Sequence, residues 1–168
     1  KLGLQVFIVI EKMDELPIVI EESKALGVRP LIGLRARLDT IGVGQWQNTG
    51  GEKSKFGLNA RKIIATCDLL SKANMLDCLS LLHFHMGSQV SSAKDIQGCV
   101  AEAAHIWASV RALGAPLSWL DVGGGLGVDY EGTRSRSTFS INYSVDEYAA
   151  VIVSAIRSTC DQHGVPHP

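Results

Sequence analysis

Apolar residues along the chain occur in short runs typical of strands and in longer segments with the spacing of helices. A strand-like run followed by a helix-like segment occurs four times. Short apolar runs predict buried strands over residues 5–10, 29–38, 79–85 and 117–122. Each run precedes a longer segment with helical spacing, and these segments predict helices over residues 14–26, 59–73, 92–113 and 144–163. Strands that alternate with helices are typical of β-α units around a parallel sheet, so the pattern predicts an α/β fold.

Residues at the expected helix ends support these limits. Asp14 can cap the first helix with its side chain, and Ser144 with Glu147 has the spacing of a capping box at the start of the last helix. Glycine allows the left-handed backbone that commonly ends a helix, and it follows the expected helices at Gly27, Gly114 and Gly164.

Four consecutive β-α units fit either part of an eight-stranded barrel or an open doubly wound sheet. The polar side chains favour the barrel, whose inner face carries the chemistry at the carboxyl ends of the strands. Polar residues fall late in strands two to four and on one alternating face, at Arg35, Arg37, His83, His85 and Asp121. The opposite face is apolar and is expected to pack against helices, at Ile32, Leu34, Leu82, Phe84, Leu120 and Val122. We therefore expect about four β-α units of a TIM-like (β/α)8 barrel.

Composition and charge are those of an ordinary globular domain, since the 168 residues are 46% hydrophobic and 20% charged with a net charge of −1. No basic cluster is interleaved with aromatic residues, which argues against nucleic acid as a partner. The longest apolar runs are far shorter than a spanning helix, so we expect no membrane segment and a cytoplasmic protein. The cysteines lack C-x-x-C spacing and are expected to be buried free thiols, at Cys67, Cys78, Cys99 and Cys160.

A glycine cluster, DVGGGLG at residues 121–127, directly follows the fourth strand. Glycines at such a point let backbone N–H groups approach an anion closely, as in phosphate-binding loops. Ser88 adds a hydroxyl donor after the neighbouring strand, so the two strand ends together predict a phosphate site. A tight turn without a ligand stays open as the alternative. The spacing fails the dinucleotide-binding motif, because Val128 stands where the last glycine of that motif belongs.

Two histidines one residue apart, His83 and His85, end the third strand in the segment LLHFHMGSQ. Three interpretations are open from the residues alone. Both imidazoles could ligate one divalent ion, although the neighbouring strand ends offer arginines and glycines, with Asp121 as the one further ligand. They could also be unliganded strand-end histidines, or one of them could stack on a flat cofactor beside the predicted phosphate site.

The segments HFHMGSQ, LDVGGGLGVDY and KSKFG together resemble the barrel domain of the pyridoxal-phosphate decarboxylases of the alanine-racemase fold type. This family includes ornithine, diaminopimelate and arginine decarboxylases. Within it, IGLRARL, NTGGEKSKFGL, LLHFHMGSQ and GVDYEGTRSRSTFSINY look like the branch that decarboxylates arginine for biosynthesis. The resemblance implies pyridoxal 5′-phosphate as the cofactor, with Mg2+ as a further component. It also implies conversion of L-arginine to agmatine and carbon dioxide in polyamine biosynthesis.

Carried over residue by residue, the resemblance implies that His85 stacks on the pyridoxal ring and that Ser88 binds the phosphate. It further implies a supporting role for Arg35 at the cofactor site. The rest of the phosphate cradle would be the backbone of Gly123, Gly124 and Gly125. The residues expected to border the substrate are Leu120, Asp121, Val122, Asp129 and Tyr130, whereas Leu126 has no assigned role.

The resemblance also implies that essential parts of the enzyme lie outside these residues. Residues 1–168 are expected to form a partial cofactor-binding barrel, with the strand of the imine-forming lysine upstream and the later strands and a C-terminal β domain downstream. Lys53 and Lys55 lie in a polar loop beside Glu52, where an imine-forming lysine would not be desolvated, so neither is assigned that role. We expect the fragment alone to be inactive. We expect the full-length protein to be a homo-oligomer, either a dimer or a tetramer.

Three alternatives to arginine decarboxylation stay open. The chain could belong to a decarboxylase of another basic amino acid or of diaminopimelate, to a metal-dependent barrel hydrolase that uses His83 and His85, or to a non-catalytic relative. The residues alone do not identify the substrate, because no acidic pocket for a guanidinium group is visible. A partial barrel leaves two strand edges unpaired, so we expect the isolated fragment to be poorly soluble or partly unfolded.

Overall fold

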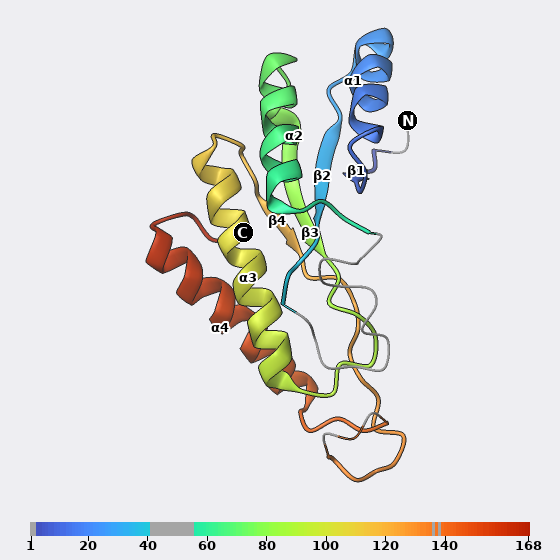
Figure 1. Cartoon of the computed structure of the whole chain (residues 1–168), viewed down its shortest axis with the longest axis vertical. Coiled ribbons are helices and arrows are strands. Elements are labelled where there is room, and N and C mark those ends of the chain that lie inside the picture. Colours follow the sequence, from blue (N-terminus) through green and yellow to red (C-terminus); the bar gives the residue numbers. More distant parts are fainter. Residues whose placement is uncertain (1–2, 41–55, 136, 138) are drawn as a thin grey trace.

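A computed structural model describes residues 3–40, 56–135, 137 and 139–168 of the chain (Figure 1). Strands and helices alternate along it, as the sequence pattern predicts. The strands are β1 (Phe7–Ile10), β2 (Leu31–Ala36), β3 (Leu79–Phe84) and β4 (Trp119–Asp121). The helices are α1 (Glu15–Leu26), α2 (Ala60–Lys72), α3 (Ala93–Ala112) and α4 (Val145–His163), with a short 3-10 helix, η2 (Leu76–Cys78), before β3.

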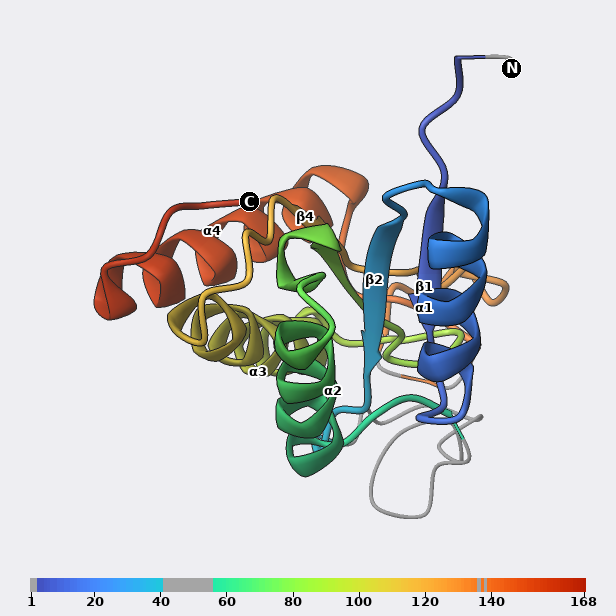
Figure 2. The same ribbon diagram turned by 90° about the horizontal axis from the view of Figure 1, so that it is seen from above.

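The four strands form one parallel sheet in the order β1-β2-β3-β4, so each strand pairs with its neighbours in sequence. Parallel neighbours need a crossover connection, and the described part of each crossover here contains one α-helix. Figure 2 shows the helices following one another around one side of the sheet. The arrangement confirms the predicted α/β fold with four β-α units.

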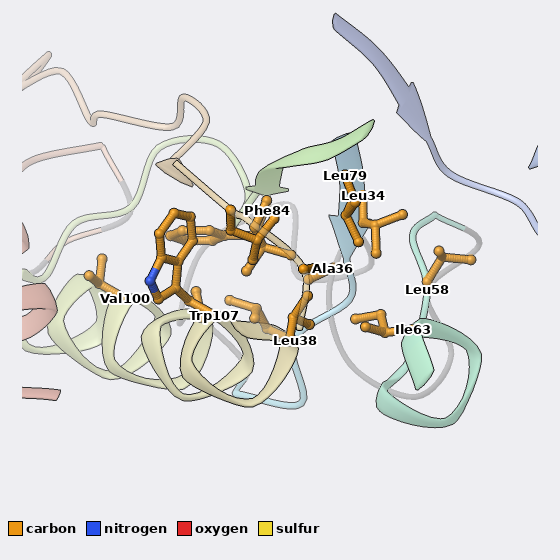
Figure 3. Close-up of a cluster of buried hydrophobic side chains, with 14 of the residues drawn as sticks. Leu34, Ala36, Leu38, Leu58, Ile63, Leu79, Phe84, Val100 and Trp107 are labelled. Carbon is orange, nitrogen blue, oxygen red and sulfur yellow. The ribbon is translucent and has the colours of Figure 1, made fainter. Parts of the chain in front are cut away.

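The hydrophobic core lies between the helices and the outer face of the sheet. Leu34, Leu82 and Phe84 are fully buried there, and Figure 3 shows Leu34 and Phe84 in one buried cluster with Trp107 of α3. The predicted apolar face is confirmed for β2 and β3, whereas Leu120 and Val122 are only partly buried against the core. The predicted free thiols are also confirmed, because all four cysteines are buried and unbridged.

The inner face of the sheet is concave. Phe7 of β1 and Trp119 of β4 belong to opposite edge strands, yet their ring centroids are 5.9 Å apart in an edge-to-face contact. Neighbouring strands are spaced about 4.8 Å apart, so the same side chains on a flat sheet would stand roughly 14 Å apart. Gly33, on the same face of β2, has no room for a side chain, since a Cβ there would lie 2.7 Å from Cδ2 of Leu81. Such curvature is what closing parallel strands into a barrel requires.

The helix-end predictions meet different outcomes. Ser144 accepts the backbone N–H of Glu147 at 3.2 Å, and the Glu147 carboxylate accepts the N–H of Ser144 at 2.7 Å, which confirms the capping box. The prediction of a side-chain cap at Asp14 is wrong, because its backbone is already helical, with φ −72° and ψ −16°, and a capping residue needs an extended backbone. Glu15 instead accepts two N–H groups of the preceding residues. The predicted helix-ending glycines all have positive φ, at Gly27, Gly114 and Gly164.

Apolar side chains remain exposed at both edges of the sheet. Val6, just before β1, is 65% exposed, and Trp119 of β4 is 52% exposed despite its contact with Phe7. This is where further strands of a barrel would pack. In the part of the chain that the structure describes, no helix has the length and apolar character needed to cross a bilayer.

Candidate functional site

A row of charged and polar side chains crosses the sheet where the strands end. Arg35 of β2 is in register with His83 of β3, and His83 is in register with Asp121 of β4. Glu11, one residue beyond β1, joins the row through its Oε2, which lies 2.8 Å from Nη1 of Arg35. The row lies on the inner face, because Leu82, the neighbour of His83, points into the core. The structure thus gathers these side chains as the alternation predicts, and adds Glu11, which the sequence analysis did not identify.

Arg35 is held from two sides. Its guanidinium is paired with Glu11, and its Cζ lies 5.2 Å from the ring centroid of Phe56, a cation–π geometry. Phe56 reaches Arg35 because the chain that follows it runs beside the end of β2. The N–H of Leu58 donates to the carbonyl of Arg35 at 2.8 Å, and Gly57 takes φ +82° there. Arg35 is therefore a fixed positive charge at the site.

His85 lies two residues after His83 and therefore on the same face. Its Nδ1 accepts the N–H of Gly87 at 3.3 Å, which assigns the ring proton to Nε2. Burial lowers the pKa of His85, and the neighbouring Arg35 and His83 lower it further, against a smaller opposite effect of Asp121. The imidazole is therefore neutral at physiological pH and presents a flat, uncharged ring.

The glycine loop (residues 123–127), which follows β4, packs its backbone against the end of β3. Gly123 has φ +66°, and a Cβ there would overlap a carbonyl oxygen of β3. Gly125 has φ +111°, and a Cβ there would overlap the carbonyl oxygen of Gly87. Gly124 differs, because no atom lies within 4 Å of the place its Cβ would take. The first and third glycines are needed for close approach, whereas open space lies beside the second.

Donors without a protein partner indicate where an anion fits. The N–H of Gly123 is already used, since it donates to Oδ1 of Asp121 at 2.8 Å. Among the described residues, the N–H groups of Gly124 and Gly125 and the hydroxyl of Ser88 have no hydrogen-bond partner. Ser88 directly follows the residue against which Gly125 packs, so the serine and the glycine loop are neighbours. Two adjacent strand ends thus offer N–H and O–H donors to one anion.

Two side chains that the sequence analysis did not identify join the glycine loop to the segment after β3. The amide of Gln89 donates to the carbonyl of Val128 at 2.7 Å and accepts its N–H at 2.9 Å. The buried hydroxyl of Tyr143 accepts the N–H of Gly127 at 3.0 Å and donates to the carbonyl of Val90 at 2.6 Å. The place of Gln89 in LLHFHMGSQ was a usable signal, whereas Tyr143 had none, because 16 residues separate it from Gly127.

The serine loop (residues 129–140, with 136 and 138 outside the described residues) is organised around the buried hydroxyl of Ser140. This hydroxyl donates to Oδ1 of Asp129 at 2.6 Å and accepts the N–H of Ser135 at 3.0 Å. The bond from Ser140 lowers the pKa of Asp129 below its usual value. Asp129 therefore holds the loop in shape, while Tyr130 is exposed. Their roles at the substrate stay predictions.

The other residues predicted to border the substrate face in two directions. Asp121 lies on the inner face, and its Oδ2 is 3.0 Å from Nδ1 of His83. Leu120 and Val122 pack toward the core, so their proposed contact with substrate would involve backbone atoms. Their roles also stay predictions.

The metal interpretation of His83 and His85 requires further ligands near the two imidazoles. No group of three or more His, Cys, Asp or Glu residues suited to a metal ion occurs among the described residues. The hydrolase alternative thus has no ligand set within this part of the chain. Lys53 and Lys55 lie outside the described residues.

Comparison with known proteins identifies relatives of the chain. The family model described as the pyridoxal binding domain of pyridoxal-dependent decarboxylases matches residues 3–167. Curated relatives include the biosynthetic arginine decarboxylases of Marinobacter nauticus and Alkalilimnicola ehrlichii, each 58% identical over all 168 residues of this chain. The solved biosynthetic arginine decarboxylase of Campylobacter jejuni is 29% identical, with a TM-score of 0.81 over 99% of this chain and 26% of its own. A Helicobacter pylori diaminopimelate decarboxylase complexed with L-lysine is 28% identical, with a TM-score of 0.75 over 90% of this chain and 36% of its own.

The chain is much shorter than the relatives that it matches. It spans 26% and 27% of the lengths of the two curated relatives. The TM-scores confirm that the four β-α units have the fold of the corresponding part of these decarboxylases, and the family match confirms the resemblance seen in the sequence. The chain belongs to the family of pyridoxal-dependent decarboxylases, since residues 3–167 match their pyridoxal-binding domain.

Proposed function

We propose that the chain is the cofactor-binding part of a biosynthetic arginine decarboxylase, which converts L-arginine to agmatine and carbon dioxide in polyamine biosynthesis. Two curated proteins with that name align with the whole chain and are each 58% identical to it. The match includes residues 127–143, one of the four segments whose sequence resembles the arginine branch. These similarities support arginine over the other amino acids that the family decarboxylates.

One observation carries the cofactor assignment: a neutral imidazole lies beside donors that have no partner in the described chain. His85 offers the ring, and Ser88, Gly124 and Gly125 offer the donors. Pyridoxal 5′-phosphate has a flat aromatic ring and a dianionic phosphate, so it matches both features. We assign ring stacking to His85 and phosphate binding to Ser88 and the backbone of residues 123–125. Within that cradle Gly123 contributes shape, because its N–H already donates to the Asp121 carboxylate.

Pyridoxal phosphate, when bound, supplies the conjugated ring that accepts the electron pair released as carbon dioxide leaves. The residues of this chain bind and orient. Arg35, fixed by Glu11 and Phe56, supports the cofactor site and helps to hold His85 in its neutral form. A neutral platform brings no second positive charge to the ring face. Residues 120–122, Asp129 and Tyr130 are assigned to the border of the substrate.

Other features of the whole enzyme are proposals that depend on the family resemblance. Residues 1–168 form part of the cofactor-binding barrel. The imine-forming lysine lies upstream, and the acidic partner of the pyridine nitrogen, the later strands and a C-terminal β domain lie downstream. The fragment alone is therefore inactive. The full-length protein is a cytoplasmic homo-oligomer, dimer or tetramer, with Mg2+ as a further component.

Carbon dioxide release by the full-length protein tests the proposal. Arginine, ornithine, lysine and diaminopimelate are each supplied with and without added pyridoxal phosphate. Release from arginine alone, dependent on the cofactor, is the expected result. Release from diaminopimelate or another amino acid would overturn the arginine assignment and retain the cofactor site. Cofactor binding without any release would indicate a non-catalytic relative.

A further inference from the structure

Both carboxylate oxygens of Asp121 are engaged, and together they link the polar row of the sheet to the glycine loop. Oδ1 accepts the N–H of Gly123 at 2.8 Å, and Oδ2 lies 3.0 Å from Nδ1 of His83. The side chain of His83 is the more enclosed partner, at 19% exposed against 52% for Asp121. The resemblance to the family assigns no role to His83.

The contact with Gly123 matters because the first turn of the glycine loop is made at this residue. A carboxylate that accepts the N–H two residues further on stabilises a tight turn. The turn at Gly123 sets the path of the next two residues, whose N–H groups have no partner within the described chain. A rotation of the Asp121 side chain would release the Gly123 N–H and let these two donors move.

His83 opposes that rotation. Its Nδ1 is buried and lies 3.0 Å from Oδ2 of Asp121 without a hydrogen bond, so the enclosed ring stands beside the carboxylate that would have to rotate. The neighbouring charge on β2 is Arg35, which is itself paired with Glu11. His85, a further titratable group on this face, accepts the N–H of Gly87 at its Nδ1. His83 is therefore the polar side chain placed to hold Asp121.

We propose that His83 and Asp121 form a positioning pair, which holds the first turn of the glycine loop and so sets the affinity for the phosphate of pyridoxal 5′-phosphate. The identity of the ligand rests on the proposed function. The pair acts through the loop backbone and not through contact with the phosphate. It differs in this respect from Ser88, Gly124 and Gly125, which are assigned to the phosphate itself.

The test compares two ligands that differ by the phosphate. The full-length protein and its His83→Ala variant are titrated with pyridoxal 5′-phosphate and with pyridoxal, and binding is followed by absorbance. The affinity of His83→Ala for pyridoxal phosphate is expected to fall about 10-fold, whereas its affinity for pyridoxal changes less than about 2-fold. A purely structural role of His83 would weaken the binding of both ligands to the same extent.

Two substitutions at Asp121 sharpen the test. Asp121→Asn keeps an oxygen that can accept the Gly123 N–H but loses the carboxylate that faces His83, whereas Asp121→Ala loses both. The preference for pyridoxal phosphate over pyridoxal is therefore expected to fall less in Asp121→Asn than in Asp121→Ala. His105→Ala removes an exposed histidine of α3 as the matched control and is expected to leave both affinities unchanged.

The proposal is overturned if folded His83→Ala binds both ligands as the unmodified protein does, or loses both affinities equally. If His83→Ala does not fold, equal preferences for the phosphate in the two Asp121 variants overturn it. Carbon dioxide release is measured on the same samples. If the unmodified protein binds pyridoxal phosphate but releases no carbon dioxide from arginine, the proposed function is wrong, whereas the proposed positioning pair is not contradicted. If the unmodified protein does not bind the cofactor, both the proposed function and the proposed positioning pair are wrong.

Discussion

The glycine loop and the serine loop follow one another in the chain, yet their shapes have opposite origins. The glycine loop is fixed by close packing, because Gly123 and Gly125 press their backbone against the end of β3. The serine loop is fixed by its own polar groups, which converge on the buried hydroxyl of Ser140. A loop held by packing can leave its N–H groups unpaired for a ligand. A loop held by hydrogen bonds consumes its polar groups, as Asp129 does, and its stability depends on protonation.

The steric half of this comparison predicts the largest effect, at Gly125. Gly125→Ala combines a positive φ with overlap of the Gly87 carbonyl, so we expect a loss of about 2–4 kcal/mol in the free energy of unfolding of the full-length protein. Gly124→Ala is the matched control, because nothing lies within 4 Å of the added methyl group. It should keep the thermal midpoint and weaken only the binding of pyridoxal phosphate. Equal midpoints for the two variants would contradict a sterically fixed loop.

Tyr143 tests the link between the glycine loop and the segment after β3. Tyr143→Phe leaves the Gly127 N–H and the Val90 carbonyl without their partner, and we expect a cost of about 1–3 kcal/mol in the free energy of unfolding. Tyr148→Phe is the control, because the described residues give its hydroxyl no hydrogen bond. Chemical denaturation of both variants measures the difference. A similar loss in both would mean that the aromatic packing, and not the hydroxyl, supports the loop.

Ser140 tests the hydrogen-bonded half. Ser140→Ala removes the donor to Asp129 and the acceptor of the Ser135 N–H, so the serine loop should lose about 1–2 kcal/mol of local stability. Hydrogen exchange of the loop amides is expected to accelerate while the exchange of the glycine loop stays unchanged. Ser137→Ala removes a half-buried hydroxyl that bonds Glu131 and the N–H of Phe139 in the same loop, and it should have a smaller effect because it leaves the bond between Ser140 and Asp129 in place. Faster exchange in both loops would show that they are one unit.

The smallest effect is a pH dependence confined to the serine loop. The hydrogen bond from Ser140 lowers the pKa of Asp129 below its usual 3.8, so the folded loop binds the proton more weakly than the unfolded chain does. The carboxylate therefore stabilises the loop above pH 3.8, and this contribution is lost as the pH falls through the lower pKa of the folded loop. Loop exchange rates of the unmodified protein and of Asp129→Asn should differ near neutral pH and converge in acid. A difference that is independent of pH would contradict this assignment.

Features with a local signal were predictable from the sequence. The apolar face of β2 and β3 followed from alternation, and the capping box at Ser144 followed from residue spacing. The glycine cluster marked the loop after β4, and the strand-end position of His85 marked its face. The prediction for Asp14 failed, because a residue type that favours caps does not reveal whether its own backbone has already entered the helix.

Features that need long-range register were not predictable. Glu11 became a site residue only because β1 and β2 align it with Arg35. The hydroxyl of Tyr143 contacts the glycine loop because the chain folds back after that loop, and no periodic pattern in the sequence indicates this path. The use of the Gly123 N–H by Asp121 also needed coordinates, since a glycine cluster alone does not show which of its donors are free.

By itself the sequence determined the four β-α units and the apolar face of β2 and β3, and it predicted the places of a phosphate loop and a stacking ring. These are properties of neighbouring residues, because the periods of helices and strands and the conformational range of glycine act over a few positions. Only the tertiary structure decided which of the polar side chains at the strand ends contact one another and that Glu11 joins them. Pairing and curvature of the sheet bring together residues distant in sequence, so that Phe7 touches Trp119 and Nδ1 of His83 lies 3.0 Å from Oδ2 of Asp121.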